Sequence, residues 1–245
     1  TGNVAIELGK AVQDNKTDVS VQGSDAAEQI TYTSAASLTD IKISGDLGAG
    51  ANTITVTPDT AAADLKTIDL SGLSATGGTL ASTITLVAAN TAITSVKGSL
   101  GADTITVVSA NKAVAIDLGK DTAIDKVDVS STKISDKSND TSIKADLVSI
   151  TNALSGDQIV LKGATSIKDR GDLSGEANLL AALGKLGESK DGTLVATTAE
   201  VFVWKGDTYV VDSVGTSLAN DDLIVKLTGI VTFNDTVDAN TITVA

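Results

Sequence analysis

Short stretches in which polar and aliphatic residues alternate recur along the whole chain. The clearest copies read NTIT at 52–55, DTIT at 103–106 and NTIT at 240–243. Looser copies read EQIT at 28–31, STIT at 82–85, DKVD at 125–128 and DQIV at 157–160. Alternation with a period of two is typical of a half-buried β-strand, with Thr and Ser on one face and aliphatic residues on the other. Each unit therefore predicts a turn followed by a short strand.

The repetition of these units predicts an all-β fold of the parallel β-helix or β-solenoid type. The units recur at irregular intervals of roughly 20–30 residues, which favours irregular coils over a strict nine-residue roll. A longer repeat is also present. IELGK at 6–10 is followed by DVS at 18–20, and IDLGK at 116–120 is followed by DVS at 128–130 with identical spacing. Because the chain has one proline, its turns depend on Gly, Asn and Asp, which tolerate positive φ.

Two segments break the strand pattern. In 174–187, Leu179, Leu183 and Leu186 recur at helical spacing, so we predict a short helical insertion. Its expected end signals are Ser174 as N-cap, Glu176 in the first turn and Gly187 just beyond the last turn. Segment 141–154 fits either a helix or a strand.

The aromatic residues mark a separate C-terminal module. Phe202, Trp204 and Tyr209 lie at alternating positions around Lys205-Gly206-Asp207, which predicts a hairpin. A second pair of strands is expected in 221–233. These aromatic residues form either a small core or a platform on which sugars stack, and core is the simpler interpretation. The expected organisation is a degenerate-repeat β-solenoid over 1–139, a mixed segment with the short helix over 140–195, and a C-terminal β module over 196–245.

Composition excludes several classes of function. The net charge of −13 argues against nucleic acid as a partner, and no apolar run reaches the length of a membrane span. The chain has no His and no Cys, so the usual zinc ligands and the commonest general base are missing, and we expect no enzyme activity. The first residues carry neither an initiator Met nor a signal peptide, which suggests a fragment of a longer protein.

One segment carries candidate metal ligands. GSLGADTIT at 98–106 matches most of the repeat G-G-x-G-x-D-x-aliphatic-x through Gly98, Gly101 and Asp103. In that repeat, calcium lies between successive turns, held by carbonyl oxygens and the Asp carboxylate. A weaker copy, GDLGAGANTIT at 45–55, offers Asp46 and Asn52. Two interpretations stay open, since Asp103 either binds calcium or simply closes a turn.

The C-terminal module resembles the conserved end of RTX-type surface-layer proteins of Gram-negative bacteria. The resemblance rests on FVWKGDTYVVDS at 202–213 and LANDDLIVKLTGIV at 218–231. Its signature positions here are Trp204, Gly206, Asp207, Thr208, Tyr209, Asp222, Leu223, Ile224, Lys226, Leu227 and Gly229. The close match covers about 50 residues, and intact nonapeptide repeats upstream are sparse.

The resemblance implies a calcium-dependent structural protein exported by a type I apparatus through an uncleaved C-terminal signal. Such proteins assemble with copies of themselves into a two-dimensional lattice on the bacterial cell surface. Another region of the full protein would then attach to cell-surface polysaccharide. Two alternatives stay open: an adhesin- or toxin-type binding module, and the carrier domain of a type I-secreted hydrolase.

Overall fold

The structure, a computed structural model, describes residues 2–7, 16–23, 27–33, 38–108, 113–186, 194–213 and 215–245, with side chains from residue 18 onward. The chain divides into two compact units, Thr1–Val127 and Asp128–Ala245. Their secondary structure is almost entirely β, with two short helices in the second unit.

The first unit consists of parallel strands in two sheets. The odd-numbered strands β1 (Gly2–Glu7), β3 (Glu28–Thr33), β5 (Ala51–Thr57), β7 (Thr79–Thr85) and β9 (Ala102–Val108) pair in that order. The even-numbered strands β2 (Lys16–Gln22), β4 (Asp40–Asp46), β6 (Thr67–Ser74), β8 (Ser95–Lys97) and β10 (Ala115–Asp117) form the other sheet.

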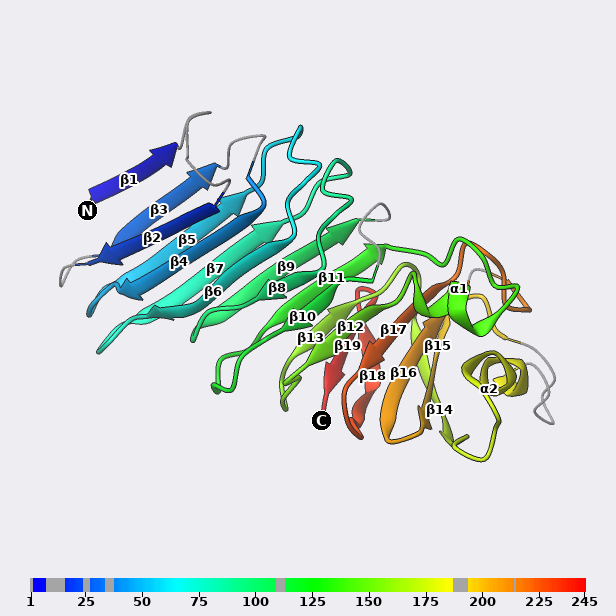
Figure 1. The fold of residues 1–245 in the computed structure, drawn as a ribbon. Coiled ribbons are helices and arrows are strands. Elements are labelled where there is room, and N and C mark those ends of the chain that lie inside the picture. The colour runs from blue at the N-terminus through cyan, green and yellow to red at the C-terminus, as the bar shows by residue number, and fades with distance from the viewer. Residues whose placement is uncertain are drawn as a thin grey trace. The chain divides into compact units, whose positions relative to one another are not determined.

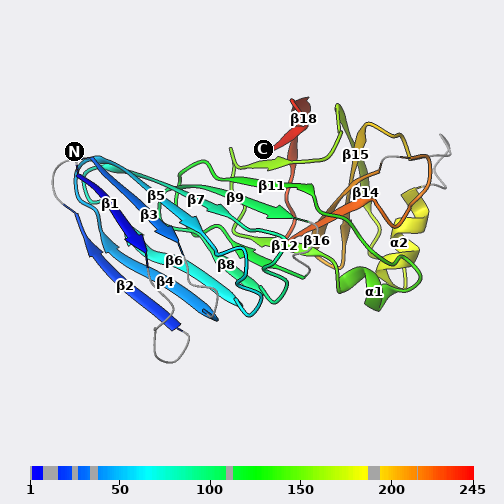
Figure 2. The ribbon, with the colours of Figure 1, turned by 90° about the horizontal axis from the view of Figure 1, so that it is seen from above.

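Consecutive strands alternate between the two sheets, so the chain winds in coils with one strand of each sheet per turn (Figures 1 and 2). Hydrogen bonds between neighbouring turns join residues 24 positions apart at Glu28 and Asn52, and 21 apart at Ser82 and Asp103. Others join residues 28 apart, at Ala62 and Asn90. The coils are therefore unequal in length, and the predicted all-β, solenoid-like fold with irregular coils is confirmed.

Stacked aliphatic side chains fill the space between the two sheets. Pairing places Tyr32 beside Val56, Val56 beside Ile84, and Ile84 beside Ile105, and all four side chains are buried. The facing sheet contributes Ile41, Ile68, Val96 and Ile116 in the same way. Such thin, regular stacking explains how a core with 2% aromatic residues can still be filled.

The second unit changes from parallel to largely antiparallel pairing. One sheet has the order β14 (Ser166–Asp172), β15 (Thr198–Trp204), β16 (Asp207–Asp212), β17 (Leu223–Leu227) and β12 (Val148–Thr151). The other contains β13 (Gln158–Val160), β19 (Thr241–Val244) and β18 (Phe233–Asp238). Strand β11 (Lys126–Ser131) begins just before the unit does. Strand β16 runs antiparallel to both of its neighbours, β15 and β17.

The hairpin predicted around Lys205-Gly206-Asp207 is confirmed. Strands β15 and β16 pair up to Trp204 and Asp207, and both residues between them have left-handed backbone, with φ of 51° at Lys205 and 85° at Gly206. This geometry matches the twist of antiparallel strands. Of the second pair of strands predicted in 221–233, only the first lies within that range. β17 forms, but Gly229 (φ 88°) ends the extended run, and Phe233 begins a strand of the other sheet.

The predicted helix exists, but it starts later than expected. Helix α2 spans Leu179–Leu186, and Ser174 and Glu176 precede it. The N-cap is Asn178, whose Oδ1 accepts from Ala181 N at 2.8 Å. Asp140 also accepts from Leu179 N at 2.7 Å, so a carboxylate from α1 (Asp140–Lys144) satisfies the exposed end of α2. Gly187 lies outside the described residues.

Segment 141–154, which fitted either a helix or a strand, contains both. Helix α1 ends at Lys144, and β12 follows from Val148. The two helices and one face of β15–β17 enclose a hydrophobic core of buried residues. It comprises Ile134, Ile143, Leu147, Leu179, Ala182, Leu183, Leu186, Leu194, Phe202, Trp204, Tyr209, Val211 and Ile224.

Candidate functional site

The glycine-rich turn before β9 is closed by the buried carboxylate of Asp103. Asp103 Oδ2 accepts from Ser99 N at 2.8 Å, and Oδ1 accepts from Ser99 Oγ at 2.8 Å. Ser82 on the neighbouring turn donates its hydroxyl to Oδ1 as well. Gly98 leaves room for this carboxylate, because a Cβ there would lie 2.0 Å from Asp103 Oδ2. Gly101 packs just as tightly, since its Cβ would lie 2.3 Å from the Leu80 carbonyl oxygen.

Burial has the largest effect on the pKa of the Asp103 carboxyl group. Loss of solvation raises the pKa of Asp103 from 3.8 to about 6, although the bonds from Ser82 and Ser99 act in the opposite direction. The negative charge of Asp121 adds to the increase. Asp103 is therefore a buried acid whose protonation state changes near neutral pH.

Side chains close other turns of the first unit in a similar way. Asn52, also buried, donates to Gly48 O at 3.2 Å and Gly50 O at 3.0 Å. Its Oδ1 accepts from Glu28 N on the preceding turn at 3.0 Å. Asp125 is buried too, and its Oδ1 accepts from Asp103 N at 2.8 Å. These polar side chains both shape one turn and attach it to the turn before.

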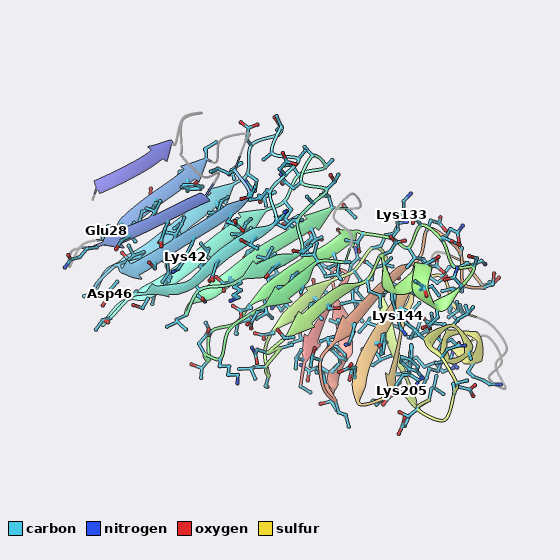
Figure 3. All side chains as sticks on the ribbon, viewed as in Figure 1. Glu28, Lys42, Asp46, Lys133, Lys144 and Lys205 are labelled. Carbon is cyan, nitrogen blue, oxygen red and sulfur yellow. The ribbon has the colours of Figure 1, made fainter. Side chains whose placement is uncertain are left out.

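Asp46 belongs to the same turn as Asn52 but lies on its outside. The exposed carboxylate of Asp46 (Figure 3) accepts from Gly48 N at 3.0 Å and Thr76 N at 2.8 Å. Hydrogen bonds from Thr76 and Gly48 lower the pKa of Asp46. Because Asn52 turns inward and its amide group already has three backbone partners, this turn offers a cation a poor set of oxygen ligands.

Asp121 supplies a carboxylate oxygen near the turn that Asp103 closes, although it belongs to neither of the glycine-rich motifs. Its Oδ1 accepts from Ala123 N at 2.8 Å, while Oδ2 is buried and has no hydrogen-bond partner among the residues that the structure describes. Gly119 (φ 94°) sits between this oxygen and the Ser99 carbonyl oxygen, since a Cβ at Gly119 would lie 3.1 Å from each. In the sequence, only the turn-forming residues Gly-Lys-Asp at 119–121 point to this carboxylate.

The residues around the turn at 98–103 therefore supply only part of the oxygen ligand set that a calcium ion prefers. Within the described ranges, no group of three or more acidic side chains is close enough to hold a metal. A cation near residues 98–103 would find Asp121 Oδ2 and the Ser99 carbonyl oxygen. Asp103 would join them only by giving up hydrogen bonds from serine.

The C-terminal signature residues form two structural networks. In the first, Asp207 accepts from Gly229 N at 2.9 Å and pairs with Lys226 Nζ at 2.8 Å. Burial acts to raise the pKa of Asp207, but Lys226 and the Gly229 N–H together hold it below its usual value. Asp222, also buried, accepts from Ala219 N at 2.7 Å. The contacts of Asp207 fix the hairpin to β17 and the turn after it, and the contact of Asp222 closes the turn before β17.

The second network is aromatic. Phe202 stacks on Tyr209 with ring centroids 5.3 Å apart, and Trp204 meets Tyr209 edge-on at 6.1 Å. Lys144 and Lys205 lie over the Trp204 ring at 5.3 and 4.6 Å (Figure 3 labels both lysines). Burial raises the pKa of Tyr209 to about 12. All three rings are buried, so they form a core rather than an exposed platform for sugars.

The two outer faces of the first unit differ in charge. On the four strands β3, β5, β7 and β9, every residue on the outward face is Gln, Ala, Thr or Val, so these strands place no charged side chain on that face. Pairing places Thr31, Thr55, Thr83 and Thr104 in one row across the sheet. The other sheet carries charged rows, in which Lys42 lies 3.8 Å from Asp18 and Lys97 lies 3.5 Å from Asp69. We call these the threonine face and the charged face.

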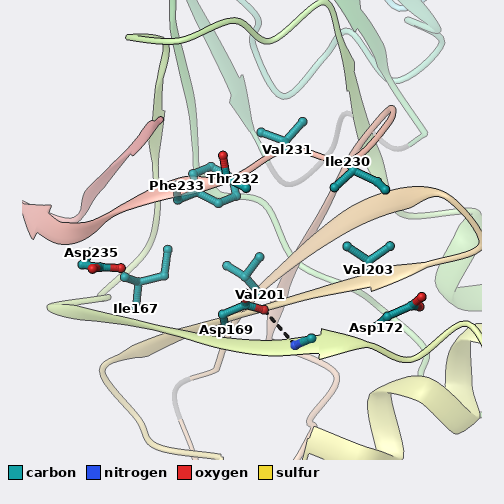
Figure 4. A pocket seen from close by; sticks show the side chains of 11 residues that line it. Ile167, Asp169, Asp172, Val201, Val203, Ile230, Val231, Thr232, Phe233 and Asp235 are labelled. Atoms are coloured by element: carbon teal, nitrogen blue, oxygen red, sulfur yellow. Dashed lines mark hydrogen bonds between the residues drawn. The ribbon is translucent and has the colours of Figure 1, made fainter.

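The second unit contains a cavity of about 320 Å³. Figure 4 shows it between β14–β15 and the segment leading into β18. The lining residues are Ile167, Asp169, Gly171, Asp172, Val201, Val203, Ile230, Val231, Thr232, Phe233 and Asp235. The sequence did not point to this cavity, because it depends on contact between β14 and β18.

Comparisons with known protein families and with curated proteins found no match to this sequence. Within the part of the chain that the structure describes, no helix is long and apolar enough to cross a membrane.

Proposed function

We propose that this chain is a non-catalytic structural segment of a bacterial surface layer, exported by a type I apparatus. It would associate with further copies of itself outside the cell. The resemblance of residues 202–231 to RTX-type surface-layer proteins supports this proposal, as does the solenoid-like repetition upstream. Attachment to cell-surface polysaccharide would fall to another region of the full protein.

The observation that carries the proposal is the uncharged threonine face. Copies of a chain with a net charge of −13 repel one another wherever their carboxylates meet. The threonine face lets two copies approach without placing like charges opposite each other. The regular row of Thr side chains across it also suits the packing of one sheet on another.

Charge placed on this face tests the proposal. We expect the double variant Thr55→Lys/Thr83→Lys to lose the sheets or multimers that the unmodified chain forms in millimolar calcium, as seen by electron microscopy and sedimentation velocity. The matched control is Ser71→Lys/Ser95→Lys on the charged face, which changes the net charge equally and should still assemble. A strictly monomeric parent chain would count against a lattice role and favour the binding module or the carrier domain.

Calcium dependence is part of the same proposal. A cation held by Asp121 Oδ2 and the Ser99 carbonyl oxygen would stabilise the folded chain by ligand linkage. We expect the melting temperature to rise by several degrees when calcium replaces chelator, and Asp121→Asn to remove most of that rise. Asp46→Asn is the control and should leave it intact. An unchanged melting temperature in the parent chain would remove calcium from the proposal.

A further inference from the structure

The cavity of the second unit has the walls of a small-ligand site. Its volume of about 320 Å³ is at the lower end of the range for ligand pockets, roughly 300–1,000 Å³. Val201 and Val203 project from β15 on the side opposite Phe202 and Trp204, so they line the cavity rather than the aromatic core. Together with Ile230 and Phe233 they provide an apolar middle section.

Every charged residue that lines the cavity is a carboxylate. Asp169 Oδ1 accepts from Gly171 N at 2.8 Å, and Asp172 Oδ1 accepts from Ser174 N at 2.8 Å. Hydrogen bonds from Ser174 hold the pKa of Asp172 below its usual value, so this group stays ionised. Asp235 is exposed on β18. Among the described residues, no Lys or Arg belongs to the lining, so no cation of this part of the chain faces the three carboxylates across the cavity.

The placement of the acids restricts the shape of the ligand. In Figure 4, Asp235 lies at one end of the cavity and Asp172 at the other, with Val201 and Val203 between them. An ammonium group at each end would meet a carboxylate, and a methylene chain would cover the apolar section. A single ammonium ion would satisfy one end only.

We propose that this cavity binds an aliphatic α,ω-diammonium ion, with one ammonium group at Asp172 and the other at Asp235. Asp169 lies along the same wall and adds to the negative potential. This site is independent of the proposed lattice function, because the threonine face belongs to the first unit and the cavity to the second.

Titration calorimetry with 1,5-diaminopentane at low ionic strength tests the site. We expect saturable binding of one diammonium ion per chain. Asp172→Asn and Asp235→Asn should each weaken the affinity about tenfold or more, the loss of one charge-assisted contact. Val203→Phe should abolish binding by filling the cavity, while circular dichroism shows that the variant is folded. Asp221→Asn, an exposed acid outside the cavity, is the matched control and should bind like the parent.

Three further ligands separate the site from general attraction to an acidic protein. Magnesium ion carries the same charge without the methylene chain, pentylamine has one ammonium group, and 1,5-pentanediol has none. Weaker binding of all three than of the diamine supports the proposal. Equal binding of magnesium, equal binding of pentylamine, or an unchanged affinity in both Asn variants would overturn it.

Discussion

At the scale of single residues, buried polar side chains shape the turns of the first unit. Asp103, Asn52 and Asp125 each lie inside the coils and bind backbone N–H groups of their own or the preceding turn. A buried acceptor that receives several donors stabilises the turn, but a buried charge costs solvation energy. Asp103 shows both effects, because its fixed hydrogen bonds coexist with a raised pKa.

The raised pKa of Asp103 predicts that the folded chain loses stability as the pH rises from 5 to 7. Its pKa is 3.8 when exposed and about 6 in the fold, so the folded chain binds the proton more tightly. This contribution to stability is fully present below 3.8 and is lost as the pH rises through about 6. Relative to Asp103→Asn, we expect the parent to be more stable at pH 5 than at pH 7 by about 1 kcal/mol, measured by urea unfolding in chelator.

Asp46→Asn is the control for this measurement. The pKa of Asp46 is lowered, so its contribution to stability is lost only as the pH falls through that lower value. Both pH 5 and pH 7 lie above this range, and the effect of the substitution should be the same at both. If Asp103→Asn also has equal effects at the two values, the raised pKa of Asp103 is refuted.

The turn-closing interpretation of Asp103 could be reached from the sequence because the information it needs is local. Gly98, Gly101 and Asp103 lie within six positions, and the turn-closing interpretation of Asp103 matches the bonds it makes. Asp121 was missed because its relation to Ser99 arises from a neighbouring coil. The predicted N-cap of α2, Ser174, was wrong for a similar reason. Part of the capping comes from Asp140, which lies 39 residues before Leu179 in the chain.

At the scale of elements, alternation located the strands but could not set their register. Asn52 and Ser82 open similar motifs, yet Asn52 pairs with Leu80, and Ser82 pairs with Ile54. The shift is two residues, which keeps Ile54 and Ile84 on the inner face. Repeats can therefore be recognised correctly and still be aligned wrongly, because the hydrophobic pattern tolerates an even shift.

An ion pair joins β14 to β15. Arg170, the only arginine of the chain, forms a bidentate pair with Glu200, in which Arg170 Nη2 lies 2.8 Å from Glu200 Oε1. The side chains are 8% and 1% exposed. We expect Arg170→Met to lower the free energy of unfolding by about 3–5 kcal/mol, because it leaves Glu200 buried without its partner. Urea unfolding measures the loss.

The double variant Arg170→Met/Glu200→Leu separates the cost of an unpaired charge from the value of the pair. Replacing both groups by apolar side chains removes the buried charge, so most of the lost stability should return. Lys168→Met, on the same strand, is the control for loss of a positive charge. A double variant as unstable as Arg170→Met would show that packing around the arginine stem, rather than charge, stabilises these strands.

At the scale of the whole molecule, charge is distributed unevenly over the surface. The sequence revealed the net charge of −13 and the Thr-rich strands. It could not reveal that Thr31, Thr55, Thr83 and Thr104 align in one row, because that depends on the register of four coils. Nor could it reveal the cavity, which joins segments 167–172, 201–203 and 230–235. Both candidate interaction sites are consequences of tertiary structure.

The uneven charge predicts how salt affects self-association. Salt shortens the screening length from about 10 Å at 0.1 M to about 3 Å at 1 M, and thereby weakens repulsion between copies. If copies meet through the uncharged threonine face, association should strengthen as sodium chloride rises, since no attractive ion pair is lost. The charged face carries the Lys42–Asp18 and Lys97–Asp69 pairs. If copies met through that face, their association should weaken as salt rises, because salt would screen attraction between the charges of the two copies. Sedimentation velocity over a series of sodium chloride concentrations at a fixed millimolar calcium concentration distinguishes these outcomes, and association that falls with salt would exclude the threonine face as the main contact.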